Sequence, residues 1–459
     1  MGLIKITCMV WLILFTGVSV SYSQGCTRTL NVGADIATAV SNAANGATIC
    51  LDNGDYGRVN LANMARTGFV TLQSLNGRNA HMSPQVGKTN YVRFREMTLT
   101  GVVVNTCSKN IEFINITWKA GGGGLVFDGS TCPSTPQNYL VDNNTFDKVG
   151  KAGYDGRLSC RDCNTITIRN STFKGIYGPD ADASDGIGIA GGATKMEIGP
   201  GNLFSGILQS LCGGEHCDAI QVFGGGSMHV FGNHFENGST FIMAPDGNSN
   251  VVVENNVFDG IGISYIDKIQ FGSARNPTFR HNTLRNVRAS FDSKPSKTAS
   301  TNAMVENNIL IYNSSWKTSS GNGCSNCTFR YNLFSHPSYA SGTNNVIGMP
   351  TFTGGTSPSS YTGYQLTETS LGFQVGSDGK DMGVDFSTVT HILDTGEQGQ
   401  HHLNRLYPSP VRRKPWAGVN TGVFNLSGSP VVWSSPRQNG FYLVRTYQGE
   451  LKKVLVIDQ

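Results

Sequence analysis

From about Val92 onward, one short pattern of apolar and polar positions recurs along the chain. A run of alternating apolar and polar residues is followed by one or two Asn and then by a large apolar residue, as in IEFINITW, ITIRNSTF, VVVENNVF and CTFRYNLF. These closing apolar residues recur every 23 to 31 residues and are Trp118, Phe146, Phe173, Phe204, Phe235, Phe258, Leu284, Leu310 and Phe334. A repeat of this length, with one strand pattern per unit and almost no helical pattern, predicts a solenoid of β coils.

The repeat also predicts how the coils hold together. One coil cannot bury its own apolar side, whereas a stack of coils buries a continuous core. We expect each strand to pair in parallel with its counterparts about 4.8 Å away. The Asn residues at matched positions would form a ladder inside a turn, so we interpret them as structural residues. The most helix-like segment, Ile36 to Ala44, would cap the open end of the stack.

Composition fits many short strands joined by tight turns, since the chain has 57 Gly and only 14% charged residues. The formal charge is +4, but the charge is uneven, because the segment from residue 401 onward carries a net +6. The body between Lys5 and that segment is therefore slightly acidic, at −3. A body of that charge excludes the basic face that a nucleic-acid-binding protein needs.

The two ends of the chain differ from its middle. Residues 1–23 carry Lys5, a short apolar run and then small residues, which is typical of a secretory signal peptide rather than a membrane span. Residues 24–400 form the predicted β domain. Residues 401–459 are a small basic module of three or four short strands. We therefore expect an exported protein without a membrane span, secreted or at the cell surface, and a monomer.

Ten cysteines remain after the signal peptide, and they fall in neighbouring pairs: Cys26 and Cys50, Cys107 and Cys132, Cys160 and Cys163, Cys212 and Cys217, Cys324 and Cys327. An even count in an exported protein favours disulfides. The alternative is zinc binding by the two C-x-x-C pairs, which the oxidising compartment and their distance in sequence disfavour.

The repeat units and the segment HCDAIQVFGG resemble the right-handed parallel β-helix family of pectate-lyase-like and alginate-lyase-like exported enzymes. The resemblance covers roughly residues 26 to 390. It implies an all-β, right-handed parallel β-helix of about ten coils, with an N-terminal cap and a small C-terminal module. The C-terminal segment GFYLVRTYQGELKKVLVIDQ is similar to sorting domains of type IX secretion substrates. The family includes lyases, hydrolases, epimerases and structural proteins, so the fold does not select the activity.

The segments SDGIGIAGG and CDAIQVFGG align with Asp185 on Asp218. Aligning all coils puts Asp155, Asp185, Asp218 and Asp267 in one column at the start of the strand before each repeat strand, with Ser239 and Thr240 in the coil between the last two. An Asp at a turn can simply shape the corner by accepting backbone hydrogen bonds, and we favour this interpretation for Asp155. The turns before Asp185 and Asp218 are long and polar, so we expect these two to line a working surface.

Stacked carboxylates cannot all stay ionised without help, which predicts either a cation or a retained proton. The favoured hypothesis is a lyase that cleaves an acidic, uronic-acid-containing polysaccharide by β-elimination. Its candidate calcium ligands are Asp180, Asp182, Asp185 and Asp218. Its candidate catalytic residues, for taking the proton and neutralising the substrate carboxylate, are His216, Asp218, Lys268 and Arg280, and Tyr177 is a candidate acid.

Two alternatives remain open at this stage. Paired Asp carboxylates could act in a glycoside hydrolase, since adjacent coils give the separation of a retaining pair and a two-coil gap that of an inverting pair. The Asp-Asp and Gly-His-Gly signatures of polygalacturonases are absent, which weakens this alternative. The other alternative is a non-catalytic surface or adhesive protein.

Overall fold

The structure is a computed structural model, and it describes residues 25–132, 136–152, 156–175, 184–212, 217–224, 226–260, 267–291, 298–317 and 324–387. Near the C-terminus it also describes residues 423–425, 440–445 and 451–456. The predicted signal peptide, Met1–Ser23, lies outside these residues. No helix in the described part of the chain is long and apolar enough to cross a membrane.

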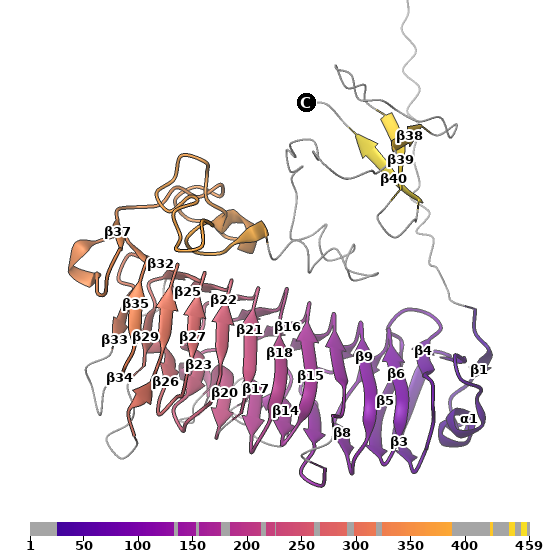
Figure 1. Cartoon of the computed structure of the whole chain (residues 1–459). Helices are drawn as coiled ribbons and strands as arrows, with labels where there is room; N and C mark the ends of the chain where they lie inside the picture. Colours follow the sequence, from indigo (N-terminus) through magenta and orange to yellow (C-terminus); the bar gives the residue numbers. More distant parts are fainter. Residues whose placement is uncertain are drawn as a thin grey trace, which may run out of the picture. The chain divides into compact units, whose positions relative to one another are not determined.

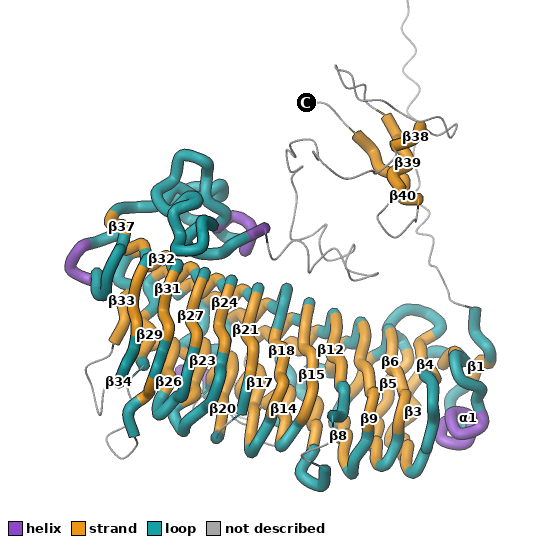
Figure 2. The backbone as a smooth tube through the Cα atoms, in the orientation of Figure 1, coloured by secondary structure: helices purple, strands orange, loops and turns teal. Residues whose placement is uncertain are grey.

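Residues 25–387 form a parallel β-helix, as the repeat predicts (Figures 1 and 2). Each coil contributes one strand to sheet A and two to sheet B, and all pairs within these two sheets are parallel. Sheet A consists of β1 (Arg28–Leu30), β2 (Thr48–Leu51), β4 (Val70–Ser74), β6 (Asn90–Arg95), β9 (Lys109–Ile114), β12 (Tyr139–Asp142), β15 (Asn164–Arg169), β18 (Thr194–Ile198), β21 (Met228–Phe231), β24 (Val252–Glu254), β27 (Thr278–Arg280), β31 (Met304–Glu306) and β35 (Thr328–Arg330).

Sheet B contains two columns of strands. We call the strands that precede sheet A in each coil the leading strands: β8 (Val102–Asn105), β11 (Leu125–Asp128), β14 (Gly156–Arg161), β17 (Asp185–Ala190), β20 (Asp218–Phe223), β23 (Thr240–Ala244), β26 (Asp267–Phe271), β29 (Arg288–Ser290) and β33 (Ser315–Lys317). The closing strands follow sheet A: β7 (Thr98–Leu99), β10 (Thr117–Trp118), β13 (Thr145–Asp147), β16 (Thr172–Lys174), β19 (Leu203–Ser205), β22 (His234–Glu236), β25 (Val257–Asp259), β28 (Thr283–Arg285), β32 (Ile309–Ile311), β36 (Leu333–Phe334) and β37 (Val346–Ile347). At the N-terminal end, β3 (Gly54–Ala62) and β5 (Ala80–Gly87) extend sheet B.

The remaining elements are short. Helix α1 (Ile36–Asn42) lies within the segment predicted to be helical, and its N-cap is Asp35, whose side chain accepts a hydrogen bond from the Thr38 backbone N–H. Strands β30 (Ser300–Thr301) and β34 (Cys324–Ser325) pair with each other. The 3₁₀ turns are η1 (Gln209–Leu211), η2 (Pro337–Tyr339) and η3 (Tyr361–Tyr364).

The closing residues of the repeat stack in the core, as the sequence predicts. Phe146, Phe173, Phe204 and Phe235 are buried in register on successive closing strands. Their rings lie nearly parallel, with centroids 4.7 Å, 4.9 Å and 4.7 Å apart. Stacked rings of neighbouring coils thus form a continuous apolar column.

The Asn ladder is confirmed at the turn between sheet A and the closing strands. The Asn256 side chain donates to the backbone oxygens of Val230 and Glu254 at 2.8 Å and 2.9 Å, and its own oxygen accepts from the Asn233 backbone N–H at 3.0 Å. Each ladder residue therefore satisfies buried backbone groups of neighbouring coils, which fixes the turn at two residues in most coils.

The five neighbouring cysteine pairs are all disulfides, as predicted. The zinc alternative is therefore wrong, because both C-x-x-C pairs are joined internally. Disulfides of this number fit an exported protein.

A C-terminal segment, residues 350–387, packs on the outer side of the last closing strands, at the orange end of the stack in Figure 1. Its apolar residues and those of the strands form a second buried cluster: Val257, Ile309, Ile311, Leu333, Phe352, Tyr361, Tyr364, Leu366, Met382 and Val384. This segment therefore covers one outer face of the β-helix and shields it from solvent.

The chain divides into two compact units, Met1–Tyr407 and Pro408–Gln459. The described part of the second unit is an antiparallel sheet of β38 (Val423–Asn425), β39 (Gly440–Arg445) and β40 (Leu451–Val456). The predicted boundary at residue 400 and the sorting role of this module stay predictions.

Candidate functional site

The lengths of the turns select one outer face of the β-helix. The turns between closing and leading strands are long before β17, β20 and β26, where they span residues 175–184, 206–217 and 260–266. The turns on the other side of the leading strands are also long, as at 245–251 and 291–303. Since loops carried by a rigid scaffold commonly bear function, we take the outer surface of β14, β17, β20, β23, β26 and β29 as the candidate site and call it the loop-bordered face.

The floor of this face follows from strand alternation. Ile187, Ile220, Ile242 and Ile269 are in register and buried in the core. The residues directly after them must point outward because successive side chains of a strand alternate in direction. Those outward residues are Gly188, Gln221, Met243 and Gln270. The floor thus presents two amide side chains that can bind hydroxyl groups.

The predicted Asp column lies along the edge of this face. Asp218 is paired with Thr240, and the register of Ile187 with Ile220 brings Asp185 to the same level as Asp218 in the next coil. The Asp185 carboxylate accepts a hydrogen bond of 2.8 Å from the Asp218 backbone N–H. Both side chains are buried, with 2% and 0% of their surface exposed. At least for Asp185, the structure therefore shows the corner-shaping contact that an Asp at a turn can make.

At the N-terminal end of the Asp column, the strand pairing differs from the sequence alignment by one residue. Gly156, not Asp155, is paired with Asp185, and Asp155 itself lies outside the described residues. A one-residue difference matters because it exchanges the two faces of a strand.

The next residue, Arg157, is a buried cation that the repeat alignment missed. Its guanidinium donates to the backbone oxygens of Lys174, at 2.8 Å, and Gly175. Burial lowers the pKa of Arg157 to about 10, and the nearby carboxylates of Asp147 and Asp185 oppose that shift. A positive charge of the protein itself thus lies close to the Asp column.

Lys268 lies at the same register position of the leading strands as Arg157, and its side chain is fully buried. Its Nζ donates a 2.9 Å hydrogen bond to the backbone oxygen of Gly238 and lies 5.6 Å from the ring centre of Phe241. A Cβ at Gly260 would lie 2.7 Å from the Lys268 Cε, so the glycine makes room for the buried side chain. Burial lowers the pKa of Lys268 to about 8. This amine is therefore partly neutral near pH 8, as a general base requires.

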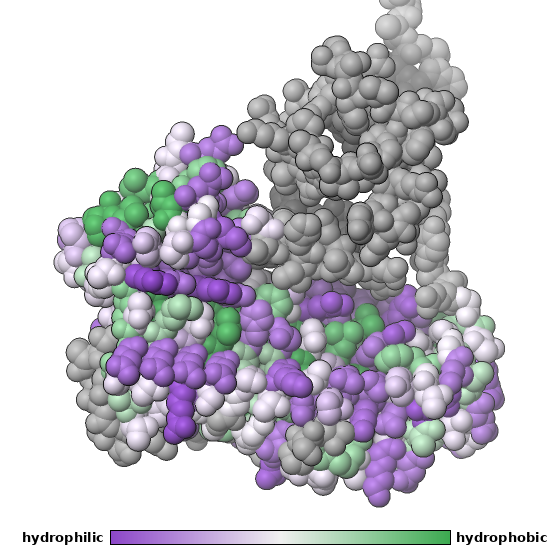
Figure 3. Space-filling model, viewed as in Figure 1, coloured by the Kyte–Doolittle hydropathy of each residue, from purple (hydrophilic) through white to green (hydrophobic). Residues whose placement is uncertain are grey.

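Arg280 is separated from Lys268 and Asp218, because it lies on β27 of sheet A. Its Nε contacts the Glu254 carboxylate at 2.6 Å. Glu254 also contacts His229 Nε2 at 2.9 Å, and His229 Nδ1 contacts Glu197 at 2.9 Å. These four residues, from successive coils, form an ionic ladder on the outer face of sheet A. The face of the molecule seen in Figure 3 carries hydrophilic residues across the coils.

The ionic ladder shifts two protonation equilibria. Burial alone would lower the pKa of His229, but the hydrogen bonds to Glu197 and Glu254 outweigh it and raise the pKa to about 9. Burial likewise raises the pKa of Glu254, and its contacts with His229 and Arg280 bring it down to about 2. His229 and Glu254 are therefore both charged at neutral pH. The strand pattern alone gave no signal for His229, since pairing with residues of adjacent coils decides its role.

Four predicted site residues lie outside the described part of the chain: Tyr177, Asp180, Asp182 and His216. Among the described residues, no group of three or more His, Cys, Asp and Glu side chains gathers as a metal site would require. The described half of the predicted calcium set, Asp185 and Asp218, is thus insufficient on its own.

No protein-family model matches the chain, and no curated protein matches it. Among solved structures, the chain is similar to a PL6 family alginate lyase, AlyGC, at 16% identity and a TM-score of 0.43, over 77% of this chain and 58% of that chain. It is also similar to the PL6 family polysaccharide lyase Pedsa3628 from Pseudopedobacter saltans, at 16% identity and a TM-score of 0.42, over 78% of this chain and 99% of that chain. A third is the pectate lyase Pel9A, at 12% identity and a TM-score of 0.40, over 78% and 96%. At these scores the matches carry no argument about the chemistry of this chain.

Proposed function

We propose that the protein is an exported polysaccharide lyase that cleaves a uronic-acid-containing glycan by β-elimination on the loop-bordered face. The observation that supports this most directly is Lys268, a fully buried lysine at the edge of that face whose pKa is lowered to about 8. Burying a lysine costs stability, and groups with strongly shifted pKa values gather at functional sites.

In the proposed reaction, the Lys268 side chain turns from its buried position toward the bound glycan, and its neutral amine removes the proton next to the uronate carboxylate. The electron pair forms a carbon–carbon double bond, and the bond to the glycosidic oxygen breaks. The departing oxygen takes a proton from an acid, for which His216 and Tyr177 are the candidates. The lone pair of the neutral amine accepts the proton, and the hydrogen bond to Gly238 holds the amine in its buried position when no substrate is bound. The amides of Gln221 and Gln270 would bind sugar hydroxyls on the floor of the face.

Arg280 is not part of this proposal, because it lies on another sheet and is paired with Glu254. Calcium stays a prediction that depends on Asp180 and Asp182, and we assign no step of the reaction to a cation. The hydrolase alternative needs Asp185 as an acid, base or nucleophile, yet this carboxylate is buried and hydrogen-bonded to the backbone of Asp218. That contact supports elimination over hydrolysis.

The test is the ultraviolet absorbance of unsaturated products when pectin, alginate or a glycosaminoglycan is offered. We expect a rise with at least one polymer and an activity that increases with pH through an apparent pKa of about 8. Lys268→Met should abolish the rise, whereas Lys195→Met, which removes an exposed lysine of sheet A, should not. No rise with any polymer would favour an adhesive protein or a hydrolase, and full activity of Lys268→Met would exclude this lysine as the base.

A further inference from the structure

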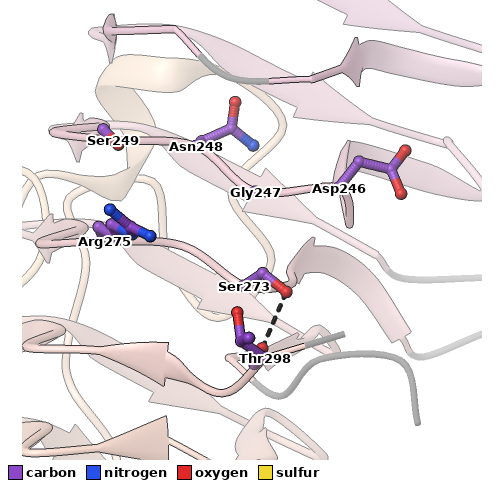
Figure 4. Close-up of a pocket in the computed structure, with 7 residues that line it drawn as sticks. All are labelled: Asp246, Gly247, Asn248, Ser249, Ser273, Arg275 and Thr298. Carbon is purple, nitrogen blue, oxygen red and sulfur yellow. Dashed lines mark hydrogen bonds between the residues drawn. The ribbon is translucent and has the colours of Figure 1, made fainter. Parts of the chain in front are cut away.

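A second feature of the loop-bordered face is a polar pocket at the edge opposite Lys268. It has a volume of about 340 Å³ and is formed by the turns that follow β23 and β26, together with Thr298 from the segment before β30 (Figure 4). Its lining residues are Asp246, Gly247, Asn248, Ser249, Ser273, Arg275 and Thr298. Such a volume is at the low end of the range for small-molecule sites, and it suits a single sugar unit.

The charges of the pocket are arranged at two ends. Arg275 and Asp246 lie at opposite sides of the close-up, with Asn248 and Ser273 between them and Ser249 on the same side as Arg275 (Figure 4). An arginine can bind a carboxylate through two parallel hydrogen bonds, and an aspartate can accept hydrogen bonds from hydroxyl groups. This arrangement matches a uronate, which has one carboxylate and several hydroxyls.

Arg275 differs from the arginines of sheet A. Arg169, Arg280 and Arg330 each pair with a carboxylate of the preceding coil, at 2.8 Å, 2.6 Å and 2.9 Å. Arg275 is exposed, and within the described ranges no ion pair or side-chain hydrogen bond engages its guanidinium. Its charge is thus available to an anionic ligand, whereas the charges on sheet A are already neutralised.

A row of outward side chains leads along the coils to this pocket. Arg161, Ala190 and Phe223 are in register on β14, β17 and β20. Phe223 is 39% exposed, so its ring is accessible to a ligand. Gln221 is paired with Met243, so Phe223, two residues further along its strand, lies beside Pro245 of the next coil. Pro245 directly precedes Asp246 of the pocket.

The spacing along this row fits a polymer. Arg161 and Phe223 are two coils apart, which is about 10 Å at the usual spacing between strands. An exposed ring provides an apolar surface against which the face of a sugar can pack, and an exposed guanidinium can bind a carboxylate. The row and the pocket together therefore present the aromatic ring of Phe223 and the cation Arg275 along the axis of the coils, whereas Arg161 is paired with Asp162 at 3.6 Å.

We propose that this edge is a second, non-catalytic binding site for an acidic glycan, in which the pocket holds a uronate carboxylate on Arg275 and Phe223 packs against a neighbouring sugar ring. The row is four residues along the strand from Lys268, about 13 Å, so a glycan bound here lies beyond the reach of the lysine. The choice of a uronate as ligand rests on the proposed function. The site itself rests on the pocket, on the available charge of Arg275 and on the exposure of Phe223.

The test uses the full-length chain carrying Lys268→Met, so that no ligand is cleaved, and trisaccharides of galacturonate and of mannuronate as probes. Calorimetry should detect binding of at least one trisaccharide, and reduction of its carboxylates to alcohols should weaken binding more than tenfold. Arg275→Gln should also weaken binding more than tenfold, and Phe223→Ala at least threefold. The control Lys119→Gln removes an exposed charge elsewhere and should leave binding unchanged.

The outcomes separate this inference from the proposed function. If wild-type protein produces unsaturated sugars but Arg275→Gln binds as tightly as its parent, the second site is refuted and the lyase proposal stands. If Arg275→Gln loses binding while the wild-type protein cleaves no polymer, the second site stands and the lyase proposal fails. Equal binding of charged and carboxyl-reduced trisaccharides would refute the carboxylate contact.

Discussion

Replacing Lys268 with Met should stabilise the protein at neutral pH while removing its activity. The lysine has no exposed surface, and burial lowers its pKa from 10.5 to about 8. A shift of that size corresponds to about 3 kcal/mol of folding free energy, since one pKa unit is worth about 1.4 kcal/mol. Losing the hydrogen bond to Gly238 costs about 1 kcal/mol, so the expected net gain at pH 7 is about 2 kcal/mol.

The sign of the pH dependence follows from the direction of the shift. Between pH 8 and 10.5 the unfolded chain holds the lysine proton more tightly than the folded chain, so the wild-type protein becomes more stable as pH rises. The advantage of Lys268→Met should therefore be largest below pH 8 and should vanish toward pH 10. Urea unfolding with intact disulfides at pH 7, 8.5 and 10 measures this difference in the free energy of unfolding. Lys195→Met, at an exposed position, is the control.

The result that would refute this reasoning is a Lys268→Met variant that is less stable than wild type by the same amount at every pH. The buried amine would then contribute to stability through packing and its hydrogen bond, and its burial would give no reason to assign it a catalytic role.

Three further outcomes are expected. Asn256→Ala should lower the free energy of unfolding by about 3 kcal/mol, because it leaves several buried backbone groups without partners, whereas Asn60→Ala on the exposed side of β3 should change it by less than about 0.5 kcal/mol in the same urea titration. Relative to wild type, His229→Gln should be destabilised most below pH 6.5, and the difference should disappear as pH rises through 9, because the raised pKa stabilises only the protonated ring; a pH-independent difference would contradict the ionic ladder. Calcium should raise the melting temperature, and Asp182→Asn should remove that rise; no effect of calcium or chelator would exclude the predicted calcium site.

Some features of the site could be read from the sequence and others could not. The sequence predicted that Asp185, Asp218 and Thr240 occupy the same register position on successive coils, because each begins the strand before a recognisable repeat unit. The charge relations of Arg157 and His229 were not, since Arg157 lies near Asp147 and Asp185 of neighbouring coils and His229 contacts Glu197 and Glu254, 32 and 25 residues away. The pocket around Arg275 gave no signal either, because its walls come from three separate segments of the chain.

The sequence by itself determined the coil repeat, the stacked rings at Phe146, Phe173 and Phe204, the Asn ladder and the disulfide pairs. The coil repeat, the rings and the Asn ladder repeat with the period of the coil, so local pattern and parallel stacking are enough to fix them. The disulfide pairs followed instead from the even number of cysteines and their neighbouring positions. Only the tertiary structure decided that Asp185 is engaged in a corner hydrogen bond and that Lys268 is buried. The direction of a side chain reverses with each residue of a strand, and its burial depends on neighbouring coils and turns, so neither follows from a periodic sequence.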